Sequence, residues 1–302
     1  MKIVNIIGGL GNQMFQYAFA TALQQHHPSE EVYIDIQHFK CLFIRKYKTA
    51  NLHNGYELEK LFPNVKLKVA GIRQLIGVTF YIPNFFISRV VRKILPQRRT
   101  EYVAPIDESQ TFHPELLDLP GNIYYEGYWQ AANYYSDCKS LLCEIFSHPT
   151  PNEYNNRMLH LIKSTPSVGI HIRRGEYLLL PRYAGICEVG YYKKAIETIM
   201  SDNKEHHFYI FSNDIDWCRK NIQPLTGDAP ITFVTGNKGV DSYWDMFLMT
   251  YCKELIIANS SFSWWGAFLN QKAKRIIAPY PWMNFRNTDD VYESSWIRIR
   301  CK

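Results

Sequence analysis

The stretch VGIHIRRGEY at residues 168–177 decides the fold, because an apolar, β-branched run passes directly into a cluster of charged side chains. After it, apolar runs alternate with helical patterns through residues 207–212 (HFYIFS), 231–235 (ITFVT), 254–259 (ELIIAN) and 274–279 (KRIIAP). Repeated strand–helix–strand units predict a parallel sheet with helices on both faces. Such sheets bind ligands at the carboxyl ends of their strands. We therefore predict an α/β fold whose polar clusters, placed where strands end, form a binding site.

The N-terminal half begins with one further strand–helix–strand pattern. The apolar run KIVNII at 2–7 meets the glycine-rich turn GGLGNQ at 8–13, a helical segment follows, and EVYIDI at 31–36 alternates like a strand. The polar stretch HPTPNEYNN at 148–156 contains two prolines and predicts a boundary between two α/β domains. The expected domains are residues 1–155 and 156–302.

The formal net charge is +6, and the basic excess lies between residues 66 and 99. Residues 38–112 follow no regular pattern. They include the segment IGVTFYIPNFFISRVVRKIL at 76–95, in which apolar side chains are followed by cationic ones, and further cations extend to Arg99. This combination favours either peripheral contact with an anionic membrane or a helix packed into the first domain, with its cations in solvent or in contact with a substrate. We expect no nucleic-acid partner.

Cysteine usage and the N-terminus bear on the compartment. The seven cysteines include no CxxC pair and no His/Cys pair at metal-ligand spacing, so neither a disulfide framework nor a zinc site is indicated. The N-terminus MKIVNIIGGLGNQ reads as a first strand and not as a signal peptide. No apolar stretch approaches the roughly 20 residues of a membrane-spanning helix. These features predict a cytoplasmic protein, soluble or peripheral to a membrane.

The turn GGLGNQ is the first candidate binding element. Its glycines lie between a strand and a helix, so backbone amides at the helix start can approach an anion or a sugar hydroxyl. The turn lacks the Lys and Ser/Thr of a phosphate-binding P-loop. A purely structural turn would not need the carboxamides of Asn12 and Gln13, which makes Gly11, Asn12 and Gln13 candidates for ligand contact.

Two polar clusters follow predicted strands of the second half. HIRRGEY at 171–177 presents Arg173 and Arg174 on opposite sides if the strand continues, so one can reach a phosphate while the other braces the loop by pairing with Glu176. An arginine at a pyrophosphate would stabilise the charge on a departing nucleoside diphosphate. NSSFS at 259–263 starts a helix, where hydroxyls and backbone amides form an anion site. The structural alternatives are a surface ion-pair network and a plain helix cap.

A third cluster, FSNDID at 211–216, ends another predicted strand. Asp214 could accept hydrogen bonds from the N–H groups of a guanine base. With Asp216 it also forms a D-x-D pattern, which metal-dependent sugar transferases use to hold a nucleotide diphosphate through a divalent cation. The structural alternative for Asp214 is a helix N-cap.

Taken in order, the blocks GGLGNQMFQYAFA (8–20), GYWQ (127–130), HIRRGEY, FSND and NSSFSWWGA (259–267) closely resemble the bacterial members of the α-1,2-fucosyltransferase family, glycosyltransferase family 11. The resemblance covers nearly the whole chain. It implies a GT-B-like fold, with two Rossmann-type α/β domains facing each other across a cleft. It further implies GDP-fucose as the donor, bound chiefly by the C-terminal domain, a galactose-containing acceptor glycan, and neither metal nor cofactor.

The same resemblance assigns roles to individual residues. Arg173 would meet the β-phosphate, Asn12 the fucose or the diphosphate, and Asp214 the guanine. The GYWQ block belongs to the acceptor side, although the Ala131 and Ala132 that follow it depart from the continuation usual in the family. The residues expected to contact GDP-fucose are Gly11, Asn12, Gln13, His171, Arg173, Arg174, Asn213, Asp214, Asn259, Ser260, Ser261, Phe262 and Ser263, and those expected on the acceptor side are Glu126, Trp129 and Gln130.

The implied reaction is a single displacement that inverts the anomeric centre, since GDP-fucose is β-linked and the product α-linked. Basic side chains and helix amides would replace a metal in neutralising the departing GDP. Arg173, Glu176 and Asn12 are the predicted catalytic residues, and Glu176 or Glu126 would accept the proton of the acceptor hydroxyl. The rival hypotheses are a non-catalytic nucleotide- or carbohydrate-binding relative and a metal-dependent transferase that uses the D-x-D aspartates.

Overall fold

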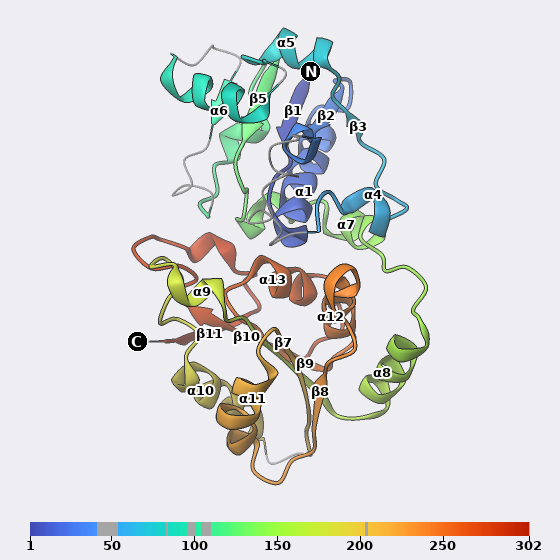
Figure 1. Ribbon diagram of the computed structural model, residues 1–302, viewed down its shortest axis with the longest axis vertical. Coiled ribbons are helices and arrows are strands. Elements are labelled where there is room, and N and C mark those ends of the chain that lie inside the picture. Colours follow the sequence, from blue (N-terminus) through green and yellow to red (C-terminus); the bar gives the residue numbers. More distant parts are fainter. Residues whose placement is uncertain (41–53, 83, 96–100, 104–109, 203–204, 302) are drawn as a thin grey trace. The chain divides into compact units, whose positions relative to one another are not determined.

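A computed structural model describes residues 1–40, 54–82, 84–95, 101–103, 110–202 and 205–301 (Figure 1). The chain divides into two compact units, Met1–Pro149 and Thr150–Lys302. The boundary expected after residue 155 falls inside helix α8 (Glu153–Ser164) of the second unit. Asn152 caps this helix by accepting a hydrogen bond from the backbone N–H of Asn155, so part of the polar stretch that suggested a linker begins a helix.

In the first unit the described strands form one sheet in the order β3-β2-β1-β5-β4, and every pairing is parallel. The strands are β1 (Lys2–Asn5), β2 (Val32–Asp35), β3 (Lys68–Val69), β4 (Glu101–Val103) and β5 (Ile123–Glu126). All residues of β1, β2 and β5 are buried, as expected for the central strands of a parallel sheet covered on both faces.

Helices cover both faces of this first sheet. Phe19 of helix α1 (Leu10–His26) stacks on Trp129 at 4.3 Å and meets Tyr125 of β5 edge-on at 5.3 Å between ring centroids. Tyr124 points to the opposite face, where it clusters with Leu75 of helix α5 (Ile72–Val78). The other described helical elements of this unit are α2 (Gln37–Lys40), α4 (Leu58–Leu61), α6 (Phe85–Ile94), η3 (Pro114–Leu117), η4 (Ala132–Tyr135) and α7 (Lys139–Ile145).

The second unit contains a parallel sheet in the order β11-β10-β9-β6-β7-β8. Its strands are β6 (Ser167–Ile172), β7 (His207–Ser212), β8 (Ile231–Val234), β9 (Glu254–Ile256), β10 (Arg275–Tyr280) and β11 (Ile297–Arg300). Its other helical elements are α9 (Glu176–Leu179), α10 (Val189–Met200), α11 (Ile215–Asn221), η5 (Gln223–Thr226), η6 (Gly239–Asp241), α12 (Tyr243–Met249), α13 (Ser261–Phe268) and η7 (Asp289–Val291).

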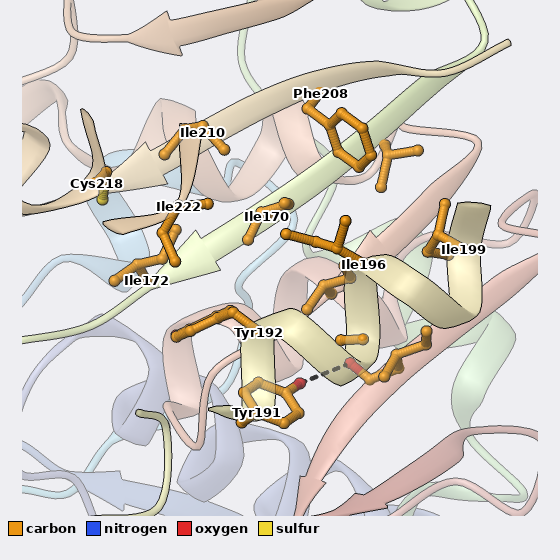
Figure 2. Packing of buried hydrophobic residues seen from close by; sticks show 14 residues of the cluster. Ile170, Ile172, Tyr191, Tyr192, Ile196, Ile199, Phe208, Ile210, Cys218 and Ile222 are labelled. Atoms are coloured by element: carbon orange, nitrogen blue, oxygen red, sulfur yellow. Dashed lines mark hydrogen bonds between the residues drawn. The ribbon is translucent and has the colours of Figure 1, made fainter. Parts of the chain in front are cut away.

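The core of the second unit orients the end of strand β6. Figure 2 shows Ile170 and Ile172 directed toward helix α10, where they join a fully buried cluster with Ile196. Side chains alternate along a strand, so Gly169 and His171 face the other side of the sheet. A Cβ at Gly169 would come within 2.8 Å of the Leu255 side chain and 2.9 Å of the Cys252 Sγ, so no larger residue fits there without displacement. The packing thereby fixes the side of the sheet to which His171 points.

The predicted α/β class with Rossmann-like parallel sheets is confirmed in both units. The predicted interfacial segment spans part of α5 and all of α6, while residues 83 and 96–99 of it lie outside the described residues. Across the described ranges, the longest apolar helices fall short of what a bilayer crossing requires.

Candidate functional site

Arg173 and Arg174 follow strand β6 and lie at the carboxyl edge of the second sheet. The Arg173 guanidinium pairs with the Glu176 carboxylate, and both side chains are about one-third exposed. The guanidinium also lies over the Tyr177 ring at 5.6 Å. Arg173 is thus held at the edge of the sheet by contacts within its own loop and remains accessible to a ligand.

Arg174 is directed differently and braces the neighbouring strand end. Its Nε lies 3.5 Å from the Asp214 carboxylate, and its guanidinium stacks on the Trp217 ring at 4.0 Å. The backbone N–H of Arg174 donates to the Asn213 Oδ1 at 2.9 Å, and the Asn213 amide returns a bond to the Arg174 carbonyl at 3.3 Å. Among the described residues, the buried Nη1 of Arg174 has no hydrogen-bond partner. The loop after β6 and the loop after β7 are therefore tied together.

Asp214 caps helix α11. Its carboxylate accepts a hydrogen bond from the backbone N–H of Trp217 at 3.1 Å, which is the structural alternative considered for this residue. Its side chain is 41% exposed, so the carboxylate also remains available to a ligand. Asp216 lies in the first turn of the same helix. Within the described ranges, no group of three or more His, Cys, Asp or Glu side chains is arranged to hold a metal ion.

His171 is a buried, neutral group beside this cationic edge. Burial, and secondarily the charge of Arg173, lowers the pKa of its imidazole to about 3, so the ring carries no proton charge at neutral pH. The ring lies 5.7 Å from Phe262 of α13 between centroids. Its Nδ1 has no hydrogen-bond partner within the described part of the chain. A neutral imidazole here can hydrogen-bond a ligand without adding charge.

The serine cluster at the start of α13 separates into internal and accessible side chains. Ser263 is buried, and its hydroxyl donates to the carbonyls of Ala258 and Ser260. Asn259 is also buried and donates to the Trp282 carbonyl at 3.1 Å. Ser261 and Phe262 are partly exposed in the first turn. Ser260 is the N-cap residue of α13, but its side chain caps no backbone N–H of the helix.

In the first unit, Gln13 is an internal clamp at the start of α1. Its amide donates to the carbonyls of Gly8 and Gly55, and its Oε1 accepts from the backbone N–H of Glu57 at 3.0 Å. Gln13 is fully buried, so its carboxamide satisfies the chain rather than a ligand. Gly11 is buried within α1.

Asn12 and Gln130, predicted for the donor and acceptor sides, are in direct contact. The Gln130 amide donates to the Asn12 Oδ1 at 2.9 Å, and the Gln110 amide donates to the Gln130 Oε1 at 2.8 Å. Gly8 has φ +80, and a Cβ there would lie 3.0 Å from the Asn12 Nδ2, so glycine leaves room for this side chain. The sequence patterns did not single out Gln110, whose role depends on a contact twenty residues along the chain.

The other two acceptor candidates, Trp129 and Glu126, are buried and bound to other residues of the first unit. Trp129 is buried against Phe19, and its backbone has φ +53. The buried Glu126 carboxylate binds two arginines of α6 that stand one turn apart: Arg89 at 2.7 Å and Arg92 at 3.0 Å. Two cations that were expected in solvent or at a membrane therefore have an internal acidic partner. The i,i+3 spacing of the two arginines on α6 was the sequence feature that could have indicated a shared partner.

This pair continues into a buried network at the carboxyl edge of the first sheet. Arg92 lies over the Tyr124 ring at 4.9 Å, and the Tyr124 hydroxyl donates to the Asp35 carboxylate at 2.8 Å. Burial raises the pKa of Asp35, with hydrogen bonds from the Gln37 backbone and Tyr124 opposing it. The charged and polar groups at this edge of the sheet are therefore bound to one another.

Asp245 of α12 is a titratable group that no sequence motif indicated. It accepts a hydrogen bond from the Asn237 amide at 2.9 Å, and Asn237 exchanges hydrogen bonds with Asn155. Burial raises the pKa of Asp245 to about 7, although the bond from Asn237 opposes this change. Its detection required the fold, since the acid is isolated in the sequence YWDMF.

One family profile and two bacterial relatives match nearly the whole chain, and a human relative matches a third of it. The profile of glycosyl transferase family 11 matches residues 1–300. An α-1,2-colitosyltransferase of Escherichia coli is 32% identical, with 98% of each chain covered. The O-antigen biosynthesis glycosyltransferase WbnK of Escherichia coli is 28% identical, covering 97% of this chain and 98% of WbnK. Human galactoside α-(1,2)-fucosyltransferase 1 is 31% identical over 105 residues, which are 34% of this chain and 28% of the human protein.

Among solved structures, the NodZ α-1,6-fucosyltransferase co-crystallised with GDP superposes with a TM-score of 0.51 at 14% identity, covering 91% of this chain and 93% of NodZ. At this identity the likeness concerns the fold, and it confirms the predicted GT-B-like class.

Proposed function

The chain belongs to glycosyl transferase family 11, and we propose that it is an inverting α-1,2-fucosyltransferase. It transfers L-fucose from GDP-fucose to the 2-hydroxyl of a galactose residue in an oligosaccharide or a surface-polysaccharide precursor. The observation that carries the proposal is the cationic carboxyl edge of the second sheet, where the accessible Arg173 stands beside the neutral His171 and the start of α13. The names of the α-1,2-transferring relatives support the linkage.

Catalysis in this proposal depends on stabilising the leaving group. As the glycosidic bond to GDP breaks, negative charge grows on the β-phosphate, and Arg173 offers two N–H groups to it. The phosphate displaces the Glu176 carboxylate, which now occupies the guanidinium. Glu176 then lies next to the reacting centre and is our candidate for accepting the proton of the acceptor hydroxyl. Glu126 suits that task less well, since its carboxylate is buried between two arginines.

The test is an acceptor screen with purified protein, GDP-fucose and a panel of galactose-terminated glycans. The expected product carries an α-1,2-linked fucose in linkage analysis, with one GDP released for each sugar transferred. Hydrolysis of GDP-fucose without transfer to any acceptor would contradict the proposal. Binding without turnover would favour the non-catalytic relative. Loss of activity in EDTA, restored by Mg²⁺ or Mn²⁺, would favour the D-x-D transferase.

A second donor, an activated colitose, is favoured by the whole-length similarity to the α-1,2-colitosyltransferase. The same acceptor panel should therefore be run with both nucleotide sugars at equal concentration. A higher kcat/KM for the colitosyl donor would replace fucose by colitose in the proposed function and leave the linkage and the leaving group unchanged.

We also propose peripheral contact of α6 with an anionic membrane. The helix exposes an apolar strip together with Lys93, although Arg89 and Arg92 bind Glu126. The strip consists of Phe86, Ile87, Val90 and Ile94, whose exposed fractions run from 38% to 75%. Vesicle co-sedimentation tests this contact: binding to anionic and not neutral vesicles at low salt is expected, and Ile87→Glu should abolish it. A protein that ignores anionic vesicles at low salt has no such contact.

A further inference from the structure

The loop that follows β10 holds an aromatic side chain in an unusual state. Phe285 is 82% exposed, and its backbone has φ +67, in the left-handed region that bulky residues rarely adopt. Neither feature serves the core, because a ring that is 82% exposed buries little apolar surface and a positive φ disfavours folding. Strained backbone of this kind persists where the surrounding structure holds it, and it concentrates at ligand-binding positions.

Two residues shortly before Phe285, Trp282 and Asn284, are hydrogen-bonded to segments of the candidate site. The backbone N–H of Asn284 donates to the Arg182 carbonyl at 2.8 Å, and the Asn284 amide donates to the carbonyls of Pro181 and Ala184 at 2.9 Å each. These partners lie in the segment that continues from the arginine loop. The Trp282 carbonyl accepts from the Asn259 amide at 3.1 Å, which joins the loop to the start of α13. The anchoring holds Phe285 in place despite its strain.

The strand order gives the direction in which a nucleotide sugar would lie. Along the carboxyl edge, Asp214 follows β7, Arg173 follows β6, the serine cluster follows β9, and Phe285 follows β10. Strands β7 and β10 are three spacings apart, about 14 Å in a parallel sheet. With the base at the β7 end and the diphosphate at β6 and β9, the sugar falls at the β10 end.

From this order we propose that Phe285 is a stacking platform for the donor sugar, an assignment that rests on the proposed function and names its sugar-binding residue. The face of an aromatic ring carries negative charge density and attracts the weakly positive C–H groups of a pyranose. A deoxy sugar adds a methyl group, which gains from apolar contact in the same way. Arg173 and Asp214 read the nucleotide, and Phe285 contacts the part that is transferred.

Two substitutions test the platform separately from the fold. Phe285→Gly removes the ring and relieves the positive φ, so the thermal midpoint should stay equal or rise. Phe285→Trp keeps an aromatic face and is the matched control. Calorimetry should show that Phe285→Gly weakens GDP-fucose binding about threefold to tenfold while GDP binding is unchanged, and that Phe285→Trp binds both as the wild type does.

The possible failures are distinguishable. An unchanged ratio of GDP-fucose to GDP affinity in Phe285→Gly overturns the platform and leaves the proposed function intact. A raised KM for the acceptor with unchanged donor binding also overturns it, because the ring would then serve the acceptor. Wild-type protein that binds neither GDP nor GDP-fucose overturns the proposed function and the platform together.

Discussion

The carboxyl edges of the two sheets use charge in opposite ways. In the first unit, Glu126 is buried between Arg89 and Arg92, and Asp35 is covered by the Tyr124 hydroxyl. In the second unit, the arginine and aspartate side chains that follow β6 and β7 stay partly exposed, and their contacts come from short loops. Similar parallel sheets thus present one edge that is internally neutralised and one that can exchange its partners for an anionic ligand.

Charge therefore supports the fold at the first edge and serves binding at the second. A buried carboxylate with two guanidinium partners is costly to disrupt, because the remaining charges stay desolvated. A partly exposed pair contributes little to stability, since water replaces either partner. Substitutions at the first edge should therefore act on folding, and those at the second edge on turnover and ligand affinity.

The largest expected effect is on stability, at Glu126. Glu126→Ala should lower the free energy of unfolding by about 3–5 kcal/mol, because it leaves the buried Arg92 without its acid and takes the carboxylate from the partly exposed Arg89. Thermal and urea melts measure this loss. Glu176→Ala is the matched control at the other edge and should cost less than about 1 kcal/mol. Equal losses of unfolding free energy in the two variants would contradict the proposed difference between the two edges.

Arg173→Ala tests whether the second edge contributes to turnover. We expect kcat to fall about 10²-fold or more with little change in the melting midpoint, because the guanidinium stabilises charge on the departing diphosphate. Arg173→Lys should recover only a small part, since an ammonium group cannot form the two parallel bonds. Steady-state kinetics on folded protein measures both. Near-normal turnover in the alanine variant would remove Arg173 from the catalytic residues.

Asp245 is a largely inaccessible acid of the second unit that has no cationic partner among the residues the structure describes. Its pKa of about 7 lies above the value of 3.8 for a free aspartate, so the folded state favours the protonated acid and loses stability as pH rises from 4 to 7. Asp245→Asn should remove this loss, stabilising the protein by up to about 4 kcal/mol at pH 8 and hardly at pH 4.

The control for this substitution is Asp241→Asn at an exposed position, which should change stability by less than about 0.5 kcal/mol at either pH. Melts at the two pH values give the comparison. A gain from Asp245→Asn that is equal at pH 4 and pH 8 would show that folding does not raise the pKa of Asp245.

The smallest expected effect concerns nucleotide choice at Asp214. Because this residue caps α11, Asp214→Asn is more informative than alanine: it keeps a capping oxygen for the Trp217 N–H and removes the charge proposed to read guanine. GDP affinity should fall about tenfold while that of UDP or ADP stays as it was, on the scale of one charged hydrogen bond. Calorimetry with the three nucleotides decides this. A parallel loss for all three would favour the metal-binding interpretation.

The sequence predicted the second unit closely because its strands are buried apolar runs. HFYIFS at 207–212 coincides with β7, and the other predicted strands differ from the structure by up to three residues at an end. Strand β11 was missed because IRIR is largely exposed and alternates charged with apolar residues at a sheet edge. In the first unit, β3, β4 and β5 were missed because they are two, three and four residues long, too short for a periodic signal.

For the candidate site, sequence reasoning selected residues but could not assign their partners. The pairing of Glu126 with α6, the clamp formed by Gln13 and the isolation of Asp245 all depend on contacts far apart in the chain. Ser261 and Ser263 look alike in NSSFS, but the structure shows that Ser261 is partly exposed and Ser263 buried. Motif spacing identifies the edge of a sheet, whereas packing decides which side chains at that edge remain available.

The side-chain amides of Gln110, Gln130 and Asn12 form a hydrogen-bonded chain with one direction from donor to acceptor. The NH₂ groups of Gln110 and Gln130 each donate to the oxygen of the next amide, so the chain of dipoles points one way and ends at Asn12. Reversing any one carboxamide would set two donors or two acceptors against each other. Asn12 therefore has its oxygen engaged, and its NH₂ group donates to no other described residue, which suits a ligand oxygen and disfavours a cationic group. A side chain at position 110, remote from the glycine-rich turn in sequence, thus sets the hydrogen-bonding sense of the residue at its end.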